Sequence, residues 1–288
     1  MLFSIFVEMK ASILFVISLL FVLTGYSQQK DNEIKVASYN IRLDTPKDSL
    51  NAWPLRKENV KALIQYHGFD LIGIQEAFHH QLLGLVEMPG FAYFGAGRDD
   101  GKRAGEHSAI LYKKDRFSIV KSGNFWLSET PEVPGKGWDA TCCNRICSWA
   151  EFKDKQSGKN FYVFNAHFDH QGSVARRESG KLMVEKMKAI AKNVPVICMG
   201  DFNSTPETEQ IKTISSFLND TFLISKMPPY GPVGTFNSFE FTASMKDRID
   251  YIFVSKDFDV SKYAVLTDAK DQRYPSDHLP VVVNVSLK

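Results

Sequence analysis

Short apolar segments rich in β-branched and aromatic residues recur along almost the whole 288-residue chain, and amphipathic segments separate some of them. Strands are predicted at 34–41, 70–74, 91–95, 107–112, 145–152, 160–166, 195–199, 249–254, 260–265 and 281–285, and helices at 53–66, 79–86, 174–192 and 207–218. No repeat or low-complexity linker interrupts this succession. Many short strands with helices between some of them favour an α/β sandwich built on mixed sheets.

Polar side chains stand at the ends of many of these apolar segments. Seven such places follow one another as Y-N-I-R (39–42), I-Q-E (74–76), G-E-H-S-A-I (105–110), N-A-H-F-D-H (165–170), M-G-D-F-N (199–203), R-I-D-Y-I-F (248–253) and P-S-D-H-L-P (275–280). Burying an unpaired charge is costly, so these groups need partners or a ligand. Because ligands commonly bind at strand ends in α/β folds, the series predicts one shared polar site at an edge of the sheets.

The residue types at these places restrict the chemistry. The chain has no G-x-S-x-G elbow, no G-x-x-x-x-G-K-[ST] loop and no G-x-G-x-x-G turn, which counts against serine hydrolases, nucleoside-triphosphate enzymes and dinucleotide enzymes. Carboxylates and amides are oxygen ligands that suit a hard cation, Mg²⁺ or Mn²⁺. Such an ion usually acts on phosphate oxygens, and neighbouring Asn and His side chains can stabilise developing negative charge.

The ordered set of polar residues resembles the endonuclease/exonuclease/phosphatase superfamily, which includes DNase I-like nucleases, inositol polyphosphate 5-phosphatases, neutral sphingomyelinases and deadenylases. G-D-F-N at 200–203 followed by S-D-H-L-P at 276–280 is the most specific part, and the resemblance spans residues 34–287. The segment G-R-D-D-G-x-x-x-G-E-H at 97–107 is similar to a secreted bacterial branch and to the deadenylases. The set comprises Asn40, Glu76, Glu106, His167, Asp201, Asn203, Asp250, Asp277 and His278.

The resemblance implies a four-layered α/β sandwich, with two packed mixed β-sheets flanked by helices, in one catalytic domain over 28–288. It implies metal-dependent hydrolysis of a phosphodiester or phosphomonoester by water attack. Glu76 would be the principal ligand of Mg²⁺ (or Mn²⁺), with Asn40 and Asp277 beside the same ion.

The resemblance also implies roles in the reaction. Asp201 would orient and deprotonate the attacking water, Asn203 would position the water or the phosphate, and His278 would stabilise the transition state. His167 would lie near the leaving group. Glu106 would orient His167 and Asp250 would orient His278, and a carboxylate partner is expected to raise the pKa of each histidine.

The N-terminus has the pattern of a signal peptide. Lys10 precedes an apolar run at 11–23, and small residues follow up to Ser27. We therefore expect residues 1–27 to be removed, a mature chain from Gln28 that is periplasmic or extracellular, and no stable membrane span after processing. An uncleaved N-terminal anchor is the alternative, although the run is shorter than the approximately 20 residues of a spanning helix.

Cysteine positions fit an oxidising compartment but leave the pairing open. Cys198 lies in an apolar strand segment and is expected to be a buried thiol. A disulfide from Cys147 to Cys142 or Cys143 and a set of buried free thiols are both compatible with the spacing. A zinc site is not expected, because no second cysteine pair exists.

The sequence leaves the substrate open among nucleic acid, a phosphorylated sugar and a phospholipid head group. A net charge of +2 gives no basic stripe of the kind expected of a processive nuclease. Separately, the chain is expected to be a monomer. Trp126, Trp138 and Tyr230 are candidates for stacking on a ring or for anchoring loops. A catalytically silent binding module on the same fold is the alternative to an enzyme, but every expected catalytic position is occupied.

The segments after 167 and at the start of the long helix offer further candidates. Asp169 and His170 would line the site, or Asp169 would pair with Arg176 or Arg177. Arg176 and Arg177 themselves are compatible with a surface position or with contact to phosphate.

Overall fold

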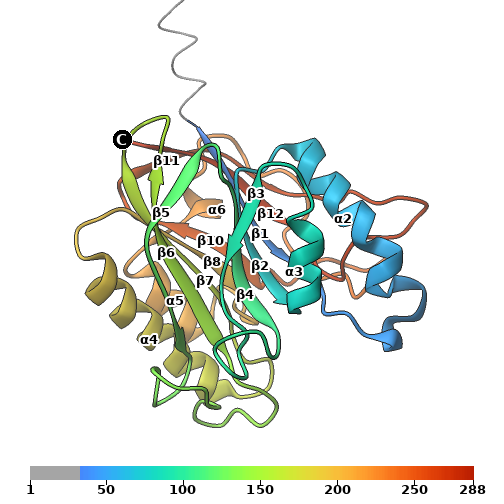
Figure 1. Ribbon diagram of the computed structural model, residues 1–288, viewed down its shortest axis with the longest axis horizontal. Coiled ribbons are helices and arrows are strands. Elements are labelled where there is room, and N and C mark those ends of the chain that lie inside the picture. The colour runs from blue at the N-terminus through green and yellow to red at the C-terminus, as the bar shows by residue number, and fades with distance from the viewer. Residues whose placement is uncertain (1–32) are drawn as a thin grey trace, which may run out of the picture. The chain divides into compact units, whose positions relative to one another are not determined.

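Two six-stranded mixed sheets pack face to face in residues 33–288, the part of the chain that the computed structural model describes (Figure 1). The first sheet has the order β11 (Phe258–Val265), β12 (Val281–Leu287), β1 (Ile34–Asn40), β2 (Leu71–Ala77), β4 (His107–Lys113) and β3 (Phe91–Phe94). The second has the order β5 (Phe117–Trp126), β6 (Ile146–Asp154), β7 (Asn160–His167), β8 (Val196–Asp201), β10 (Asp250–Val254) and β9 (Asn219–Asp220). The predicted signal peptide lies outside the described residues.

Helices cover the outer faces of both sheets. The helical segments are η1 (Pro46–Asn51), α2 (Trp53–His67), α3 (His79–Leu85), α4 (Ser173–Ala191), α5 (Glu209–Ser215) and α6 (Thr221–Ile224). Leu63 and Ile64 of α2 share one outer core with Tyr39 of β1, whereas Met183 of α4 and Ile211 of α5 belong to the other. The resulting helix–sheet–sheet–helix order confirms the four-layered sandwich predicted from the sequence (Figure 1).

Strand alternation places one apolar face of each sheet against the other. Side chains at 34 and 36 in β1, 161 and 163 in β7, 197 and 199 in β8, and 252 and 254 in β10 all lie in the central core. Successive side chains of a strand point to opposite faces, so the intervening positions face the helices. Their burial supplies most of the driving force, at about 25 cal/mol per Å² of apolar surface.

Two strands of the second sheet were not predicted. β5 pairs only with β6 at the sheet edge, and its middle residues Val120–Ser122 are exposed. β9 has two residues. An edge strand needs no continuous apolar face, so its pattern does not stand out in the sequence.

A buried amide pair ties the two sheets together below the polar edge. Asn165 of β7 donates from Nδ2 to the backbone oxygens of Ile74 and Ala109, at 2.9 and 2.8 Å, and accepts from Gln75 Nε2 at 2.7 Å. Gly73 permits this crossing, because a Cβ there would lie 2.7 Å from the Asn165 amide oxygen. The relative position of the sheets is therefore fixed next to the predicted site.

The cysteines adopt a pairing that was not expected from their spacing. Cys142 and Cys143, adjacent in the chain, form a disulfide, while Cys147 and Cys198 are buried free thiols. The disulfide from Cys147 to Cys142 or Cys143, one of the two expected arrangements, is therefore not formed. Cys147 points into the core beneath α4, whereas the pair lies in the preceding loop.

None of the helices among residues 33–288 is both long and apolar enough to cross a membrane.

Candidate active site

A pocket of about 370 Å³ opens at the polar edge of the two sheets. Its lining includes seven of the nine predicted residues, Glu76, Glu106, His167, Asp201, Asn203, Asp277 and His278. The other two, Asn40 and Asp250, are fully buried behind it and bond to pocket residues. A second hollow of about 460 Å³ lies at the other end of β7 and β8, and lysines form much of its lining.

Strand alternation explains why four of these side chains converge. Asn40, His167 and Asp201 each continue the inward-facing series of β1, β7 and β8 at the end of the strand, and Asp250 begins the inward-facing series of β10. β7 and β8 run parallel and β10 runs antiparallel to β8, so these ends meet at one edge. The same periodicity that builds the apolar core thus continues into a polar cluster.

Glu76 reaches the pocket by a departure from that alternation. The pairing of β2 with β4 shifts register between Ile74 and Ala77, and Glu76 has a left-handed φ of 64°. A β-bulge of this kind re-aims a side chain. A positive φ costs a non-glycine residue about 1–3 kcal/mol, a strain that clusters at functional sites. Asn203, with φ 46°, has the same conformation directly after β8.

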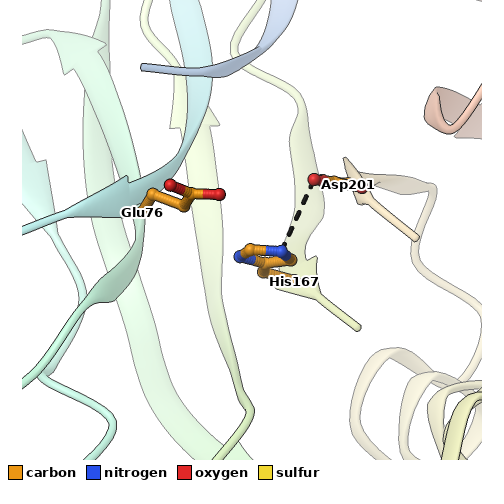
Figure 2. Close-up of side chains that lie close together, drawn as sticks. All are labelled: Glu76, His167 and Asp201. Atoms are coloured by element: carbon orange, nitrogen blue, oxygen red, sulfur yellow. Dashed lines mark ion pairs between the residues drawn. The ribbon is translucent and has the colours of Figure 1, made fainter. Parts of the chain in front are cut away.

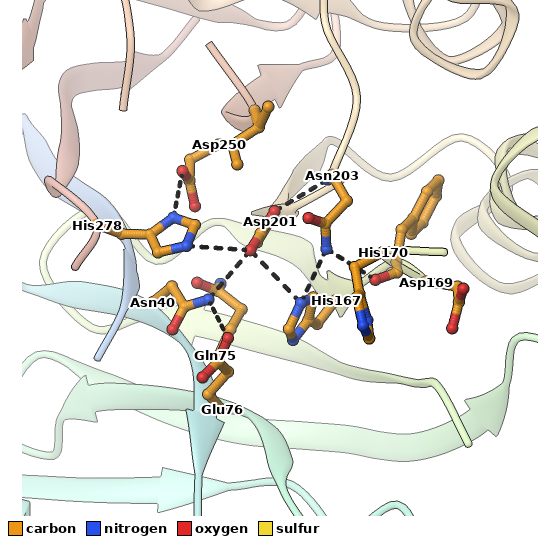
Figure 3. A network of polar contacts seen from close by, with 12 residues as sticks. Asn40, Gln75, Glu76, His167, Asp169, His170, Asp201, Asn203, Asp250 and His278 are labelled. Atoms are coloured by element: carbon orange, nitrogen blue, oxygen red, sulfur yellow. Dashed lines mark hydrogen bonds and ion pairs between the residues drawn. The ribbon is translucent and has the colours of Figure 1, made fainter. Parts of the chain in front are cut away.

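Asn40 connects carboxylates from both sheets. Its Nδ2 lies 3.0 Å from Glu76 Oε1 and 3.0 Å from Asp201 Oδ2, and its Oδ1 accepts from the backbone N–H of Arg42 at 3.0 Å (Figure 3). Glu76, His167 and Asp201 offer one ligand atom each within 4.8 Å of one another (Figure 2).

His278 is held by a buried carboxylate, as predicted. Its Nδ1 lies 2.9 Å from Asp250 Oδ2, and its Nε2 lies 3.7 Å from Asp201 Oδ2 (Figure 3). Burial alone would lower the pKa of His278, but Asp250 and Asp201 outweigh it and raise that pKa well above its usual value. Thr235 Oγ1 donates to the same Asp250 oxygen and fixes its position. His278 therefore presents a cationic Nε2–H to the pocket.

His167 differs from its predicted state. Glu106 Oε2 lies 4.0 Å from His167 Nδ1, too far for a hydrogen bond, and instead accepts from Arg98 Nη1 at 2.7 Å. Burial and the cations Arg145 and Arg98 lower the pKa of His167 well below its usual value. Glu106 therefore does not hydrogen-bond to His167 as expected, and the pKa of His167 is lowered instead of raised. Its Nε2 lies 3.1 Å from Asn203 Nδ2.

Negative charge accumulates at the centre of the cluster. Burial and the neighbouring Asp250 raise the pKa of Asp201 to about 7, and burial together with Glu76 raises that of Asp277. Arg42 lies between Glu76 and Asp277, at 3.7 and 3.8 Å. These oxygen donors and their excess charge fit a hard divalent cation, which would favour the ionised carboxylates. Asp277 nevertheless lies outside the two His/Asp/Glu groups among residues 33–288 that are compact enough to ligate one ion, Glu76–His167–Asp201 and Asp201–Asp250–His278.

Three arginines that were not predicted as site residues also line the pocket. Arg42 forms two bonds to Asp48, at 3.0 and 3.1 Å, and Arg98 bonds to Glu106. Arg145, directly before β6, is 5% exposed. Both Arg42 and Arg145 adjoin apolar strand segments. A search for polar residues at strand ends would therefore have found them if it had included arginine.

The remaining candidates fall into different places. Trp126 is buried and donates from Nε1 to the Arg98 backbone oxygen, so it anchors a loop. His170 lines the pocket. The Asp169 carboxylate accepts from the backbone N–H groups of residues 171 and 172, and the helix arginine Arg176 donates from Nη1 to the Asp169 backbone oxygen at 3.1 Å. The others lie away from the pocket lining, namely Trp138, Tyr230, Arg176 and Arg177.

A four-layered sandwich with this cluster at the edge of its sheets defines a DNase I-like phosphoesterase fold. The chain belongs to the endonuclease/exonuclease/phosphatase family, whose model matches residues 37–278. The match covers all nine predicted residues.

Two solved structures and one curated relative illustrate the similarity. A family protein from Bacteroides thetaiotaomicron is 46% identical, with 89% of this chain and 95% of that chain covered and a TM-score of 0.86. A mannosyl-6-phosphatase from the same organism is also 46% identical, over 88% of this chain and 100% of that chain, with a TM-score of 0.84. An uncharacterised protein of Acanthamoeba polyphaga mimivirus is 25% identical over 87% of this chain and 99% of its own length. The chain spans only 30% and 38% of the length of two further curated relatives.

Proposed function

We propose that the chain is a divalent-metal-dependent phosphatase that acts on phosphorylated sugars. The observation that carries the proposal is the buried cluster in which Asp201 and Glu76 share the Asn40 amide while cationic His278 faces Asp201. The choice of a sugar is supported by the 46% identity to a mannosyl-6-phosphatase along nearly the whole described chain.

The residues that would hold the cation are Glu76, Asn40 and Asp277, with Asp201 adjacent. When bound, Mg²⁺ or Mn²⁺ supplies positive charge to the phosphate oxygens and to the departing oxygen.

The protein's own groups account for the rest of the reaction. Asp201 accepts a proton from the attacking water, a task for which a pKa near neutrality is suitable. His278, kept cationic by Asp250, stabilises the charge that builds on the phosphoryl oxygens. Asn203, fixed by its backbone bond to Asp201 Oδ1 at 2.9 Å, orients water or phosphate. Neutral His167 lies beside Asn203 and is placed to contact the leaving oxygen.

The size and charge of the site favour a small substrate over a polynucleotide. A pocket of about 370 Å³ is at the small end of ligand sites. The net charge of +2 gives little of the sequence-independent attraction that backbone phosphates require.

Hydrolysis of a substrate panel tests this proposal. Purified protein should release phosphate from mannose 6-phosphate and from a mannoside carrying 6-phosphate in Mg²⁺, and EDTA should abolish the release. Plasmid DNA, RNA, sphingomyelin and inositol phosphates are the competing substrates. Faster cleavage of DNA or RNA would assign a nuclease instead, and no turnover of any substrate would favour a silent binding module.

We propose in addition that the enzyme is exported after removal of residues 1–27. The charged residue Lys10 before the apolar run at 11–23 supports this. N-terminal sequencing of material from outside the cytoplasm should find Gln28, and an intact Met1 or Met9 in the cytoplasm would contradict it.

A further inference from the structure

Arg145 is a buried cation with unused hydrogen-bonding capacity at the pocket wall. Its Nη2 lies 2.8 Å from His170 Nδ1, and its Nε lies 3.6 Å from Asp169 Oδ2, just beyond hydrogen-bond distance. Neither Nε nor Nη1 has a hydrogen-bond partner among the described residues. At 5% exposure, unpaired guanidinium N–H groups are costly, and a buried donor left unsatisfied commonly marks a ligand position.

The other two pocket arginines are hydrogen-bonded to carboxylates. Arg42 bonds to Asp48 at 3.0 and 3.1 Å, and Arg98 bonds to Glu106 at 2.7 Å. Arg145 has no hydrogen-bonded carboxylate among the described residues, because Asp169 Oδ2 stays at 3.6 Å. Asp169 balances the Arg145 charge at 3.6 Å without a hydrogen bond, so the Nη1–H donor of Arg145 remains available to an anion in the pocket.

Arg145 and His278, two of the cationic groups that line the pocket, lie on different sides of it. His170 and Asp169, which flank the Arg145 guanidinium, lie on one side of His167, whereas His278 lies on the other (Figure 3). A phosphate bound against the Asp201–His167 pair, whose facing atoms lie 3.4 Å apart, would thus have His278 on one side and Arg145 on the other. A phosphate monoester presents three terminal oxygens and close to two charges at neutral pH, whereas a diester presents two oxygens and one charge.

We propose that Arg145 selects phosphate monoesters by binding a terminal oxygen of the phosphate on the side away from His278. This inference rests on the proposed function and deepens it. Arg145 would touch the substrate but take no proton from it, and Asp169 and His170 would position the guanidinium. A planar guanidinium is well suited to this, since it remains charged when buried and donates in fixed directions.

The test compares two esters with the same leaving group, p-nitrophenyl phosphate and bis(p-nitrophenyl) phosphate, in Mg²⁺. Arg145→Gln should lower kcat/KM for the monoester by about 10–100-fold, the value of one charged hydrogen bond. The kcat/KM for the diester should change by less than about threefold. Arg145→Lys should retain part of the monoester activity. Arg177→Gln, which removes a helix-surface charge outside the pocket lining, should change neither.

The ratio of the two activities keeps the result independent of folding. A fraction of unfolded Arg145→Gln would reduce both rates equally and leave the ratio unchanged. Equal losses on both esters, or no loss on either, would therefore overturn the assignment.

Binding of inorganic phosphate separates this inference from the proposed function. Calorimetry in Mg²⁺ should show wild-type protein binding inorganic phosphate at least about tenfold more tightly than dimethyl phosphate, and Arg145→Gln should remove that difference. If the wild type hydrolyses neither ester, the phosphatase proposal fails, but loss of phosphate preference in Arg145→Gln still supports the subsite. Unchanged phosphate affinity in the variant refutes it.

Discussion

Asn40 Nδ2 lies 3.0 Å from Asp201 Oδ2, and this hydrogen bond joins the inward faces of the two sheets at their polar edge. The same nitrogen lies 3.0 Å from Glu76 Oε1. One neutral amide thus holds apart two carboxylates that would otherwise repel each other. The spacing of the proposed metal ligand and the proposed base therefore depends on how the sheets pack, and not on a loop.

Removal of the Glu76 carboxylate should abolish the response to metal. Wild-type protein should gain thermal stability with Mg²⁺, by about 2.7 kcal/mol at a concentration 100 times the dissociation constant. Glu76→Ala should show no such gain and no metal-dependent activity. Glu87→Ala is the matched control, because Glu87 is an exposed acid that pairs with Lys57 and Lys61. An equal Mg²⁺ shift in Glu76→Ala and wild type, measured by thermal unfolding, would exclude Glu76 as a ligand.

Neutralising Asp201 should cost rate without costing stability. Asp201→Asn preserves the size of the side chain but cannot accept the water proton, so kcat should fall by about 10²–10⁴-fold. The melting temperature should stay equal or rise, because a buried carboxylate next to Asp250 is removed. Steady-state kinetics and thermal unfolding on the same sample decide this. Near-normal kcat in Asp201→Asn would remove Asp201 from the reaction.

The raised pKa of Asp201 predicts a pH-dependent stability in EDTA. A group whose pKa rises on folding, here from 3.8 to about 7, contributes most stability below its unfolded pKa and loses it as the pH rises through the folded pKa. Asp201→Asn lacks this loss. The difference in free energy of unfolding between the variant and the wild type should therefore shift in favour of the variant by about 2–3 kcal/mol between roughly pH 5 and pH 8. Urea unfolding at both pH values measures the difference. A pH-independent difference would mean that Asp201 titrates normally.

His278 should matter for both rate and stability. Removing its charge in His278→Ala leaves Asp250 buried without its cationic partner, which typically costs about 3–5 kcal/mol. The rate should also fall by about 10²–10³-fold from lost transition-state stabilisation. His67→Ala is the control, since His67 forms a similar pair with Asp268, at 2.9 Å, outside the pocket lining. Equal effects of the two substitutions would contradict a special role for His278.

Regular periodicity explains which parts of the site were predictable. Asn40, His167 and Asp201 continue the apolar alternation of their strands, so the strand pattern alone places them on the inner face. Glu76 does not follow this rule: its position in β2 would direct it to the helix side, and only the bulge turns it inward. Its place at a strand end (I-Q-E, 74–76) and the family resemblance, not the alternation, identified it.

Long-range pairing explains what the sequence could not predict. Glu106 is expected beside His167, but Arg98 lies eight residues before Glu106 on a tight loop and binds its carboxylate instead. Burial of His167 and the nearby cations Arg145 and Arg98 then reverse the expected pKa shift. The Cys142–Cys143 pair was not predicted because adjacent cysteines rarely bond to each other. Which side chains pair with each other depends on distances in the folded structure, and spacing along the chain does not give these distances.

The Cys142–Cys143 disulfide should influence substrate binding more than stability. It closes almost no loop, so the entropy it removes from the unfolded chain is small. Both cysteines line the pocket, and the preceding residue Thr141 donates from Oγ1 to Gln171 Oε1 at 2.6 Å. The double substitution Cys142→Ser and Cys143→Ser should therefore leave the melting temperature within a few degrees but raise KM, by about 3–10-fold, as the wall loses its preorganised shape.

Thiol labelling of the native protein checks the redox state on which this prediction depends. Before reduction no cysteine should react with iodoacetamide, because Cys147 and Cys198 are fully buried and burial raises the pKa of both thiols. After mild reduction two labels should appear, and peptide mass spectrometry should locate them at Cys142 and Cys143. Reduced wild type should then match the double variant in KM. Labels on Cys147 would contradict the assigned pairing. An unchanged KM in both reduced wild type and the double variant would contradict a contact of the disulfide with substrate.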